Sequence, residues 1–423
     1  MTELNVYFRR RRVGRALSDD LERFSFLYDD EWLRYDRNFP ISLRLPLHRR
    51  RWPAAQAHPF FANLLPEGAS RQAICRRLGI SVDNDVALLA AIGDDTAGAL
   101  RFITNGGIPE LTAPTDPIPI LEDDLRTWSE GAPTFVTEPA QPPRLSLAGA
   151  QHKVGVVLDD QSNYCIAASG QPSTHLLKFD ARDYPHLASN EFLTTRLASA
   201  LGLEVVKMKI DDFSPRPFLV IDRYDRIPIA GPSGEQILRL HQEDFCQVRG
   251  VVPTQKYEIE GGPMLAEIAE SIRSYSSTPA KDLLRLARWA IFCALCGNAD
   301  GHAKNLSLVY SPHGLRLAPF YDLVCTRAFE GLAPSLAMAI GGERNSDRLR
   351  LHHFHDLATG LGIQPRKVES EVSRMLANVD DAFARASAEL EQAVGFSPAV
   401  ERVERAIQKR VRAIGNNLKQ DRE

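Results

Sequence analysis

The chain has 423 residues, of which 44% are hydrophobic and 25% charged, so it can bury a sizeable core in roughly two or three domains. Its 51 basic and 54 acidic residues give a formal net charge of -3, which excludes a protein that binds nucleic acid through a global positive field. The amino terminus is charged where a signal peptide would be apolar, and no apolar run reaches the ~18 residues of a membrane helix. We therefore expect a cytoplasmic protein with no membrane partner.

The first 143 residues predict a small unit followed by a connection. Residues 1–108 mix strand-like runs, such as Phe24–Tyr28, with helical stretches that end in the apolar run 88–92 before a glycine. This mixture predicts an amino-terminal α+β subdomain. Residues 109–143 hold eight of the 27 prolines, a density that breaks regular structure, so we expect a proline-rich connection with one short helix over 121–128.

The remainder predicts a strand-rich lobe and then a helix-rich lobe. Within 144–228 one helix is expected over 190–201, among the strand-like runs Val154–Leu158, His175–Phe179, Val205–Ile210 and Phe218–Ile221. Within 229–423 apolar residues recur at helical spacing, first over 283–294 and later over 368–383. The expected fold class is α+β, in the order of lobes that bilobal ATP-dependent kinases have.

Two clusters of metal-binding residue types have simpler explanations. The six cysteines are scattered, which favours reduced thiols over a disulfide framework. Cys293 and Cys296 look like half of a zinc site, but no second pair lies at finger spacing and their surroundings are apolar, so we expect both in the core. His352, His353 and His355 are expected at a surface or helix start, with a ligand role as the alternative.

One segment carries the residue types that phosphoryl transfer needs. Asp300 precedes Asn305 by five residues, the offset of the protein-kinase catalytic loop, in which the Asp is the base and the Asn a metal ligand. After a strand-like run and a turn, a second run leads to Asp322. Two carboxylates and an amide at one hairpin edge offer the hard oxygen ligands that Mg²⁺ prefers. A tight Asn-x-Asp-Gly turn is the structural alternative for Asp300.

Upstream, two features would supply contacts to ATP phosphates. The small-residue loop Leu145–Lys153 precedes a strand and would let backbone amides approach phosphate oxygens, with a simple hairpin turn as the alternative. Lys178 ends a strand-like run, where it would either present a cation to the phosphates or face solvent. Glu191 would either pair with Lys178, as in kinases, or be a first-turn helix carboxylate.

Several motifs, in their order along the chain, resemble those of HipA toxins. They are Phe61–Gly68, Gly93–Ala99, Leu147–Lys153, Thr174–Lys178, Asp222–Arg226, Gln242–Cys246, Lys256–Glu258, Gly261–Pro263, Asp300–Asn305 and Pro319–Asp322. The likeness covers nearly the whole chain. It implies a bilobal protein-kinase-like fold with an additional amino-terminal subdomain, and a serine/threonine kinase that is the toxin of a type II toxin–antitoxin pair.

The same resemblance assigns roles to individual residues. Asp300 would be the base, with Lys304 and His302 as further catalytic residues, and Asn305 and Asp322 would hold Mg²⁺. The residues that would bind ATP are Ala148, Gly149, Ala150, Gln151, His152, Lys153, Lys178, Asp222, Arg223, Tyr224, His302, Ala303, Lys304, Asn305, Tyr321 and Asp322. Within this set, residues 148–153 would cover the phosphates and residues 222–224 would form the adenine hinge.

The resemblance also implies regulation and partners. Autophosphorylation of Ser146 would add negative charge inside the phosphate loop and repel ATP. The neutralising partner would be a HipB-like helix-turn-helix antitoxin that binds operator DNA. The protein substrate would be an aminoacyl-tRNA synthetase, whose phosphorylation inhibits translation and growth.

Two positions depart from the family pattern. Asp222 stands where the best-known form has Glu, a shortening that leaves backbone hydrogen bonding at the hinge intact. Residues 357–363 carry no basic side chain where the well-studied form contacts DNA, so DNA contact is expected through the antitoxin.

The arginine clusters 9–12 and 49–51 are expected to be solvated surface, with phosphate contact as the alternative. The rival functions are a lipid or small-molecule kinase and a catalytically silent co-repressor that only binds its antitoxin.

Overall fold

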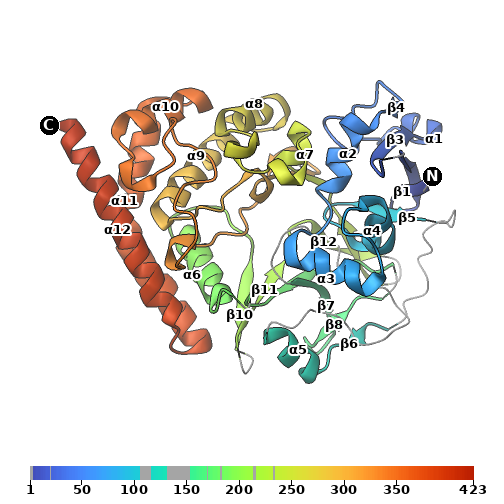
Figure 1. Cartoon of the computed structure of the whole chain (residues 1–423), viewed down its shortest axis with the longest axis horizontal. Coiled ribbons are helices and arrows are strands. Elements are labelled where there is room, and N and C mark those ends of the chain that lie inside the picture. Colours follow the sequence, from blue (N-terminus) through green and yellow to red (C-terminus); the bar gives the residue numbers. More distant parts are fainter. Residues whose placement is uncertain are drawn as a thin grey trace. The chain divides into compact units, whose positions relative to one another are not determined.

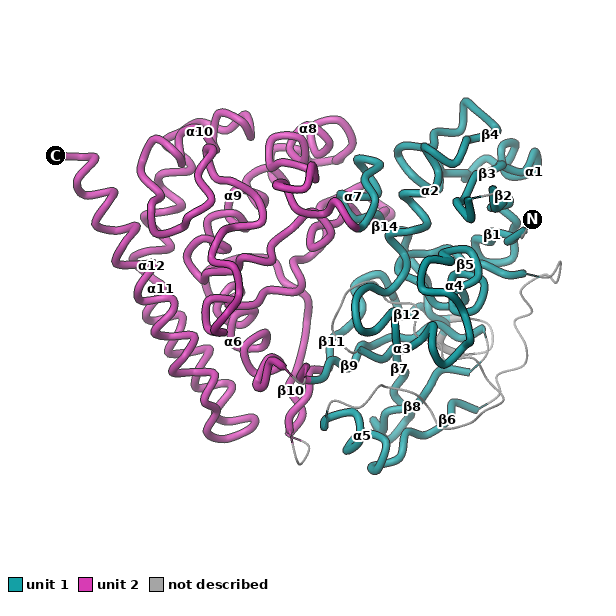
Figure 2. Tube along the Cα trace, viewed as in Figure 1, with its two compact units in different colours: residues 1–179, 220–253 teal, residues 180–219, 254–423 magenta. Residues whose placement is uncertain are grey.

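The structure is a computed structural model that describes residues 3–19, 21–104, 116–130, 153–168, 170–181, 183–212, 216–231 and 234–423. It divides into two compact units, each drawn from two stretches of sequence (Figure 2). Unit 1 comprises Met1–Phe179 and Val220–Pro253, and unit 2 comprises Asp180–Leu219 and Thr254–Glu423. The two units are defined by which residues pack together. The sequence predicted a different division, by sequence character, into the segments 1–108, 109–143, 144–228 and 229–423. These four segments therefore stay a prediction.

An antiparallel sheet with the strand order β4-β3-β2-β1-β5 forms the first part of unit 1. Its strands are β1 (Glu3–Phe8), β2 (Arg11–Ser18), β3 (Phe24–Tyr28), β4 (Arg51–Trp52) and β5 (Leu100–Ile103). The rings of Phe24 and Phe26 lie 4.8 and 5.9 Å from the ring of Phe61 on α2 (Ala54–Ala62). The predicted strand over 24–28 is confirmed. Every second residue of β3 is buried, so one apolar face of the strand packs against that helix.

A second sheet carries most of the predicted strand-rich segment. Its neighbouring strands include, in order, β11, β9, β7, β8 and β6. Their bounds are β6 (Ile118–Pro119), β7 (Lys153–Leu158), β8 (Tyr164–Ile166), β9 (His175–Lys178) and β11 (Phe218–Asp222). The strands predicted over 154–158, 175–179 and 218–221 are confirmed. So is the short helix predicted over 121–128, which is α5 (Glu122–Ser129).

Short elements complete unit 1. They are α1 (Asp30–Leu33), α3 (Gly68–Leu78), α4 (Asp85–Ile92), β12 (Arg226–Gly231), β13 (Gly234–Arg239), β14 (Gln242–Asp244) and α7 (Phe245–Arg249). Two of the helices begin at side-chain caps, since the Asn84 side chain accepts a hydrogen bond from the Ala87 N–H and the Asp244 side chain accepts one from the Gln247 N–H. The apolar run 88–92 forms the second half of α4, as its composition predicts.

Unit 2 is mainly helical. Its elements are α6 (Leu187–Ala200), β10 (Met208–Asp211), α8 (Leu265–Tyr275), α9 (Pro279–Cys296), β15 (Ser307–Ser311), β16 (Gly314–Leu317), α10 (Leu351–Leu361), α11 (Pro365–Val394) and α12 (Pro398–Arg422). The apolar stripes predicted over 283–294 and 368–383 lie on α9 and α11, and nearly all their residues are buried. The long helices α11 and α12 follow each other in the chain and lie beside each other, and the carboxyl terminus is at the far end of α12 (Figure 1).

Two predicted boundaries in unit 2 are wrong, and tertiary contacts explain both. The helix predicted from Asn190 begins at Leu187, because the Asp180 carboxylate accepts hydrogen bonds from the N–H groups of His186 at 2.6 Å and Ala188 at 2.9 Å. The strand predicted from Val205 begins at Met208, because Val205 instead forms a parallel bridge with Phe320. A cap six residues upstream and a distant bridge leave no local signal in the sequence.

The cysteines and the histidines 352, 353 and 355 lie where they were expected, in the core and at a helix start. All six cysteines lie within the described ranges, are buried and form no disulfide. Burial raises the pKa of Cys293 and Cys296, so both stay protonated thiols in the core. His352, His353 and His355 lie in the first half of α10.

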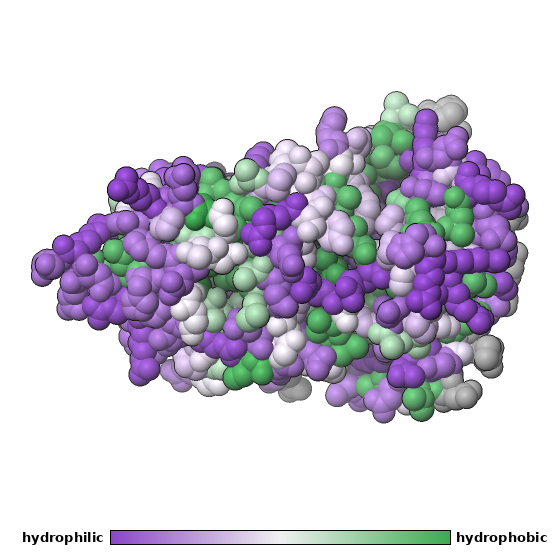
Figure 3. Space-filling view, turned by 90° about the horizontal axis from the view of Figure 1, so that it is seen from above, coloured by the Kyte–Doolittle hydropathy of each residue, from purple (hydrophilic) through white to green (hydrophobic). Residues whose placement is uncertain are grey.

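On the face shown in Figure 3, hydrophobic side chains form separate patches among hydrophilic ones. Within the described ranges, no helix is both long and apolar enough to span a bilayer.

Candidate active site

The segment that carries Asp300 begins where α9 ends. Pro279 occupies the first turn of α9, where a missing N–H costs nothing, and the buried stripe holds the helix in unit 2. The helix stops at Gly297, whose φ of +72° lies in the left-handed region that glycine adopts without strain. The chain therefore leaves the helix axis immediately before the loop 298–305.

Hydrogen bonds within this loop fix the backbone around Asp300. The Asn298 side-chain oxygen accepts a hydrogen bond from the Asp300 N–H at 3.0 Å. The Asp300 carbonyl accepts one from the His302 N–H at 2.8 Å and another from Nδ2 of Asn305, also at 2.8 Å. The Asp300 side chain stays 52% exposed. The turn considered as an alternative is thus present, and it leaves an accessible carboxylate on a fixed backbone.

Two further contacts attach the loop to the rest of unit 2. Thr326 accepts a hydrogen bond from the Ala299 N–H at 2.8 Å and donates one to the Gly297 carbonyl at 2.9 Å. Gly301 lies directly against α9, because a Cβ at this position would lie 3.2 Å from both Cys293 Sγ and the Trp289 ring. A larger residue at 301 would push the loop away from the helix.

A buried carboxylate fixes the hairpin β15–β16 to α9. Asp282 is 0% exposed and accepts hydrogen bonds from the Leu317 N–H at 3.0 Å, from Arg285 at 3.0 Å and from Arg316 at 3.2 Å. Burial by itself raises the pKa of Asp282, but the bonds from Arg316, Leu317, Ser276 and Arg285 outweigh it and lower the pKa below its usual value. The hairpin that leads to Asp322 is therefore bound to the helix that leads to Asp300.

Asp322 follows this hairpin in a conformation that few residues adopt. Its φ of +59° lies in the left-handed region, which Asp tolerates better than most residues and which indicates a functional constraint where it occurs. The preceding Tyr321 donates a hydrogen bond to the Lys304 carbonyl at 2.7 Å, and its hydroxyl also lies 2.7 Å from the Ser307 hydroxyl. These bonds attach the segment 319–322 to the loop that holds Asp300 and Asn305.

Asn190 is a positioning residue that the sequence analysis missed. It is 1% exposed on α6, donates a hydrogen bond to the Cys325 carbonyl at 3.0 Å and accepts one from the Cys325 N–H at 2.8 Å. This pair of bonds holds the backbone three residues beyond Asp322. A buried Asn inside a helix is a weak signal, because only the tertiary structure shows which backbone it meets.

Glu191, next on α6, is 0% exposed. It lies in the second turn of a helix that begins at Leu187, so its interpretation as a first-turn carboxylate is wrong. Its predicted pairing with Lys178 stays a prediction. His302, Ala303 and Lys304 are also buried, at 5%, 0% and 7% exposure.

The other predicted ATP-binding residues belong to unit 1 or lie outside the described residues. Lys153 and Lys178 are directly opposite each other on β7 and β9, and Lys178 is 6% exposed, so it does not face solvent. The Asp222 side chain is 52% exposed, with its Oδ1 3.5 Å from Nε2 of His175, and the Tyr224 hydroxyl donates to Gln242. Ser146 and the residues 148–152, namely Ala148, Gly149, Ala150, Gln151 and His152, lie outside the described residues.

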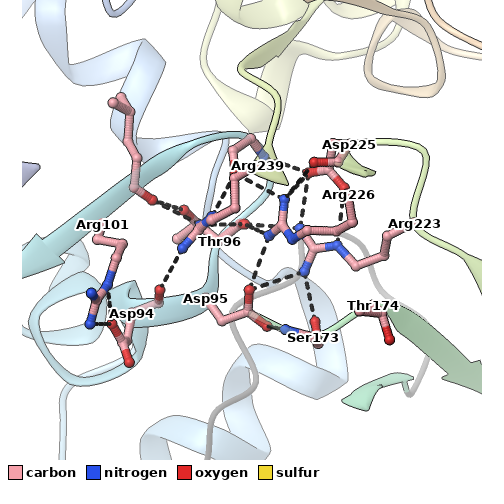
Figure 4. Close-up of polar contacts among 12 residues, drawn as sticks. Asp94, Asp95, Thr96, Arg101, Ser173, Thr174, Arg223, Asp225, Arg226 and Arg239 are labelled. Carbon is pink, nitrogen blue, oxygen red and sulfur yellow. Dashed lines mark hydrogen bonds and ion pairs between the residues drawn. The ribbon is translucent and has the colours of Figure 1, made fainter. Parts of the chain in front are cut away.

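Arg223 belongs to a buried ionic network in unit 1 (Figure 4). Asp225 accepts hydrogen bonds from Arg223 at 3.0 Å, from Arg226 at 2.8 Å and from the Gly98 N–H at 2.8 Å. Asp95 accepts one from Arg226 at 3.0 Å and one from Arg223 at 3.3 Å. The guanidinium of Arg223 is thus committed to protein partners, so any role of this residue at the hinge would be left to its backbone.

The network joins two motifs that are far apart in the sequence. Arg239 adds hydrogen bonds to the carbonyls of Asp94 and Leu100 at 3.0 Å, of Gly98 at 3.1 Å and of Thr96 at 3.1 Å. Burial raises the pKa of Asp95, but the surrounding guanidiniums outweigh it and lower the pKa to about 2. The network therefore fixes the segment 93–100 against the segment 222–226.

Comparisons with known proteins decide the family. The model of the HipA-like C-terminal domain matches residues 145–383, more than half of the chain, and that of the HipA N-terminal domain matches residues 4–103. The chain belongs to the HipA family. "Serine/threonine-protein kinase toxin HipA" of Shewanella oneidensis is 32% identical to this HipA-family chain over 375 residues, which is 86% of this chain and 84% of the relative. "Putative kinase Y4mE" of Sinorhizobium fredii is 37% identical over 386 residues, which is 90% of this chain and 91% of that protein.

A solved structure extends the likeness to three dimensions. The HipA chain in a complex of Shewanella oneidensis HipA, HipB and operator DNA has a TM-score of 0.81 at 29% identity, covering 97% of this chain and 96% of that one. The α+β, HipA-like fold expected from the sequence is confirmed. This HipA-family chain is a serine/threonine-protein kinase.

Asp95→Asn should destabilise the protein at neutral pH by roughly 3 kcal/mol, because it leaves two buried guanidiniums without one of their counter-charges. The folded-state pKa of about 2 lies below the unfolded value. The stabilisation from Asp95 is therefore complete above about pH 4 and is lost as the pH falls through about 2. Urea unfolding of both proteins between pH 7 and pH 2 measures it. The partly exposed neighbour is the control: Asp94→Asn, which weakens only the ion pair with Arg101, should change stability by under about 1 kcal/mol, and an equal effect of both variants would contradict the buried network.

Asn190→Ala should lower the free energy of unfolding by about 2 kcal/mol, because it leaves the buried Cys325 N–H without its partner and leaves the Cys325 carbonyl with only the hydrogen bond from the Ala328 N–H. Chemical denaturation measures this loss. Thr359→Ala on α10, which removes an exposed side-chain bond to the His355 carbonyl, serves as the control and should cost under about 1 kcal/mol. Equal losses in the two variants would show that the Asn190 bonds contribute nothing special.

Proposed function

We propose that this HipA-family kinase transfers the γ-phosphoryl group of ATP-Mg²⁺ to a serine or threonine hydroxyl of a protein, with Asp300 as the general base. The observation that carries the proposal is the accessible Asp300 carboxylate on a backbone fixed by Asn298, His302 and Asn305. A base in phosphoryl transfer must hold the acceptor hydroxyl and receive its proton. An exposed carboxylate whose main chain is held by three hydrogen bonds is suited to both tasks.

The oxygen donors of this loop fit a magnesium ion. Asn305 donates through its Nδ2 to Asp300, so its Oδ1 is the atom that would ligate the metal. Asp322 would add a carboxylate oxygen, held by the left-handed backbone that follows Tyr321. Mg²⁺ prefers such hard oxygen ligands, and when bound with ATP it would neutralise charge on the phosphates during transfer.

The remaining nucleotide contacts are part of the same proposal. Lys178 would hold the phosphates, an interaction supported by the low exposure of this lysine at the end of β9. Residues 148–153 would cover the phosphates, and the backbone of 222–224 would contact the adenine. His302 and Lys304 would flank the phosphates, Tyr321 would contact the nucleotide, and autophosphorylation of Ser146 would repel ATP.

We extend the proposal to partners. The Shewanella oneidensis relative is a toxin solved with HipB and operator DNA, which supports a helix-turn-helix antitoxin as the neutralising partner. Operator DNA would be bound through that antitoxin, since residues 357–363 at the end of α10 carry no basic side chain. An aminoacyl-tRNA synthetase would be the cytoplasmic substrate, and its phosphorylation would inhibit translation and growth.

Asp300→Ala should reduce phosphate transfer from γ-labelled ATP by about 10²- to 10⁴-fold, the usual contribution of a general base. Its melting temperature should stay near that of the wild type, because the side chain is half exposed. Asp356→Ala, an exposed aspartate on α10, is the matched control and should keep full activity. Equal transfer by the wild type and Asp300→Ala would leave only a binding function with the antitoxin.

Asp322→Asn tests the proposed metal role of Asp322 without changing the left-handed conformation of its backbone. Asn also tolerates a positive φ, so stability should change by under about 0.5 kcal/mol. Loss of the charged ligand should raise the Mg²⁺ concentration for half-maximal activity by at least about tenfold. A magnesium titration of ATP turnover measures this shift, and an unchanged titration curve would remove Asp322 from the metal site.

A further inference from the structure

Tyr257 contacts the candidate base directly. Its hydroxyl donates a hydrogen bond to Oδ1 of Asp300. Its ring also meets the His302 ring edge to face, with centroids 5.1 Å apart and planes at 83°. Nε2 of His302 lies 3.8 Å from the same Oδ1. One oxygen of the Asp300 carboxylate therefore faces Tyr257 and His302, which directs the other oxygen away from them.

The backbone around Tyr257 is a tight turn that depends on glycine. The Gly262 N–H donates to the Tyr257 carbonyl at 2.9 Å, across the short helix η3 (Glu258–Glu260). Gly261 has a φ of +87°, and a Cβ on Gly262 would lie 2.3 Å from the Gln255 carbonyl oxygen and 2.7 Å from that of Tyr257. Contacts this short do not occur for real Cβ atoms, so any other residue at 262 must open the turn.

A side-chain anchor holds the turn in unit 2. Glu258 accepts a hydrogen bond from the Ala339 N–H at 2.6 Å and lies 3.3 Å from the Arg344 guanidinium. Its own N–H donates to the Ala337 carbonyl at 3.3 Å. Apolar burial does not explain this construction, because Ile259 at the centre of the turn is 78% exposed. The defined contacts of the turn are the polar ones made by Tyr257 and Glu258.

We infer that Tyr257 is a positioning residue for phosphoryl transfer. By occupying Oδ1 of Asp300, its hydroxyl fixes the rotamer of the carboxylate and leaves Oδ2 to receive the hydrogen bond of the acceptor hydroxyl. This role rests on the proposed function of Asp300 as the base. It assigns a purpose to the Lys256–Glu258 and Gly261–Pro263 motifs, which form the turn that presents the tyrosine.

Tyr257→Phe tests the inference, because it removes only the hydroxyl and keeps the ring against His302. The variant loses the hydrogen bond that orients the Asp300 carboxylate, so the single-turnover rate of transfer from γ-labelled ATP should fall about tenfold. The Kd for a fluorescent ATP analogue should stay within about twofold of the wild type, since the inference assigns this hydroxyl to the base and not to the nucleotide. Tyr275→Phe, a 43% exposed tyrosine at the end of α8, is the matched control and should change neither quantity.

A second variant tests whether the turn acts through the tyrosine. Gly262→Ala opens the turn and should lower the transfer rate as much as Tyr257→Phe does, whereas Gly360→Ala, whose added Cβ would have its nearest neighbour at 3.6 Å, should not. The double variant of 257 and 262 should be no slower than Gly262→Ala alone, because both changes remove one interaction. In the Asp300→Ala background, Tyr257→Phe should have no further effect.

The outcomes separate this inference from the proposed function. If Asp300→Ala is inactive but Tyr257→Phe transfers phosphate at the wild-type rate, Tyr257 is not a positioning residue although the base assignment holds. A loss seen only in ATP binding, or fully additive effects of 257 and 262, would also overturn the inference. If Asp300→Ala retains wild-type activity, the proposed function fails and the inference fails with it.

Discussion

The candidate site depends on one hydrogen bond, donated by the Asn305 side chain to the Asp300 carbonyl at 2.8 Å. It closes the loop after α9 into a small ring, so the backbone that carries the base cannot move independently of the proposed metal ligand. The same bond uses the amide nitrogen of Asn305 and leaves its oxygen as the atom that would bind the proposed metal. The Asp-to-Asn spacing of five residues has this physical meaning: it is the separation at which one loop can close on itself and still expose a carboxylate.

Around this loop, hydrogen bonds from buried and half-buried polar groups add to apolar packing and determine which segments meet. Asp282 connects the β15–β16 hairpin to α9, Asn190 holds the backbone of Cys325, and Tyr321 attaches Asp322 to the loop. In unit 1, Asp95 and Asp225 do the same for segments more than a hundred residues apart. Apolar contacts tolerate small shifts, whereas a buried carboxylate that loses a guanidinium partner pays a large desolvation cost, so such groups fix one register.

The structure departs from what the sequence predicts where these long-range bonds act. The periodic elements, such as the α9 stripe and the alternating strand β3, were predictable because burial of one face requires a local repeat. The start of α6 was not, since its cap is Asp180. No role was predicted for Asn190, or for Tyr257 beyond its place in the Lys256–Glu258 motif. A buried amide in a helix and a tyrosine before a turn acquire a role only through the partner that folding brings to them.

The sequence by itself determined the α+β class, the main helices and strands and the family, and it predicted Asp300, Asn305 and Asp322 as one chemical set. These follow from local periodicity and from motif spacing, which survive without coordinates. Only the tertiary structure decided that Arg223 is committed to a buried ionic network, that Asp322 adopts a left-handed backbone, and that a tyrosine hydroxyl meets the base. These properties depend on which groups meet through space, and a single sequence does not contain that information.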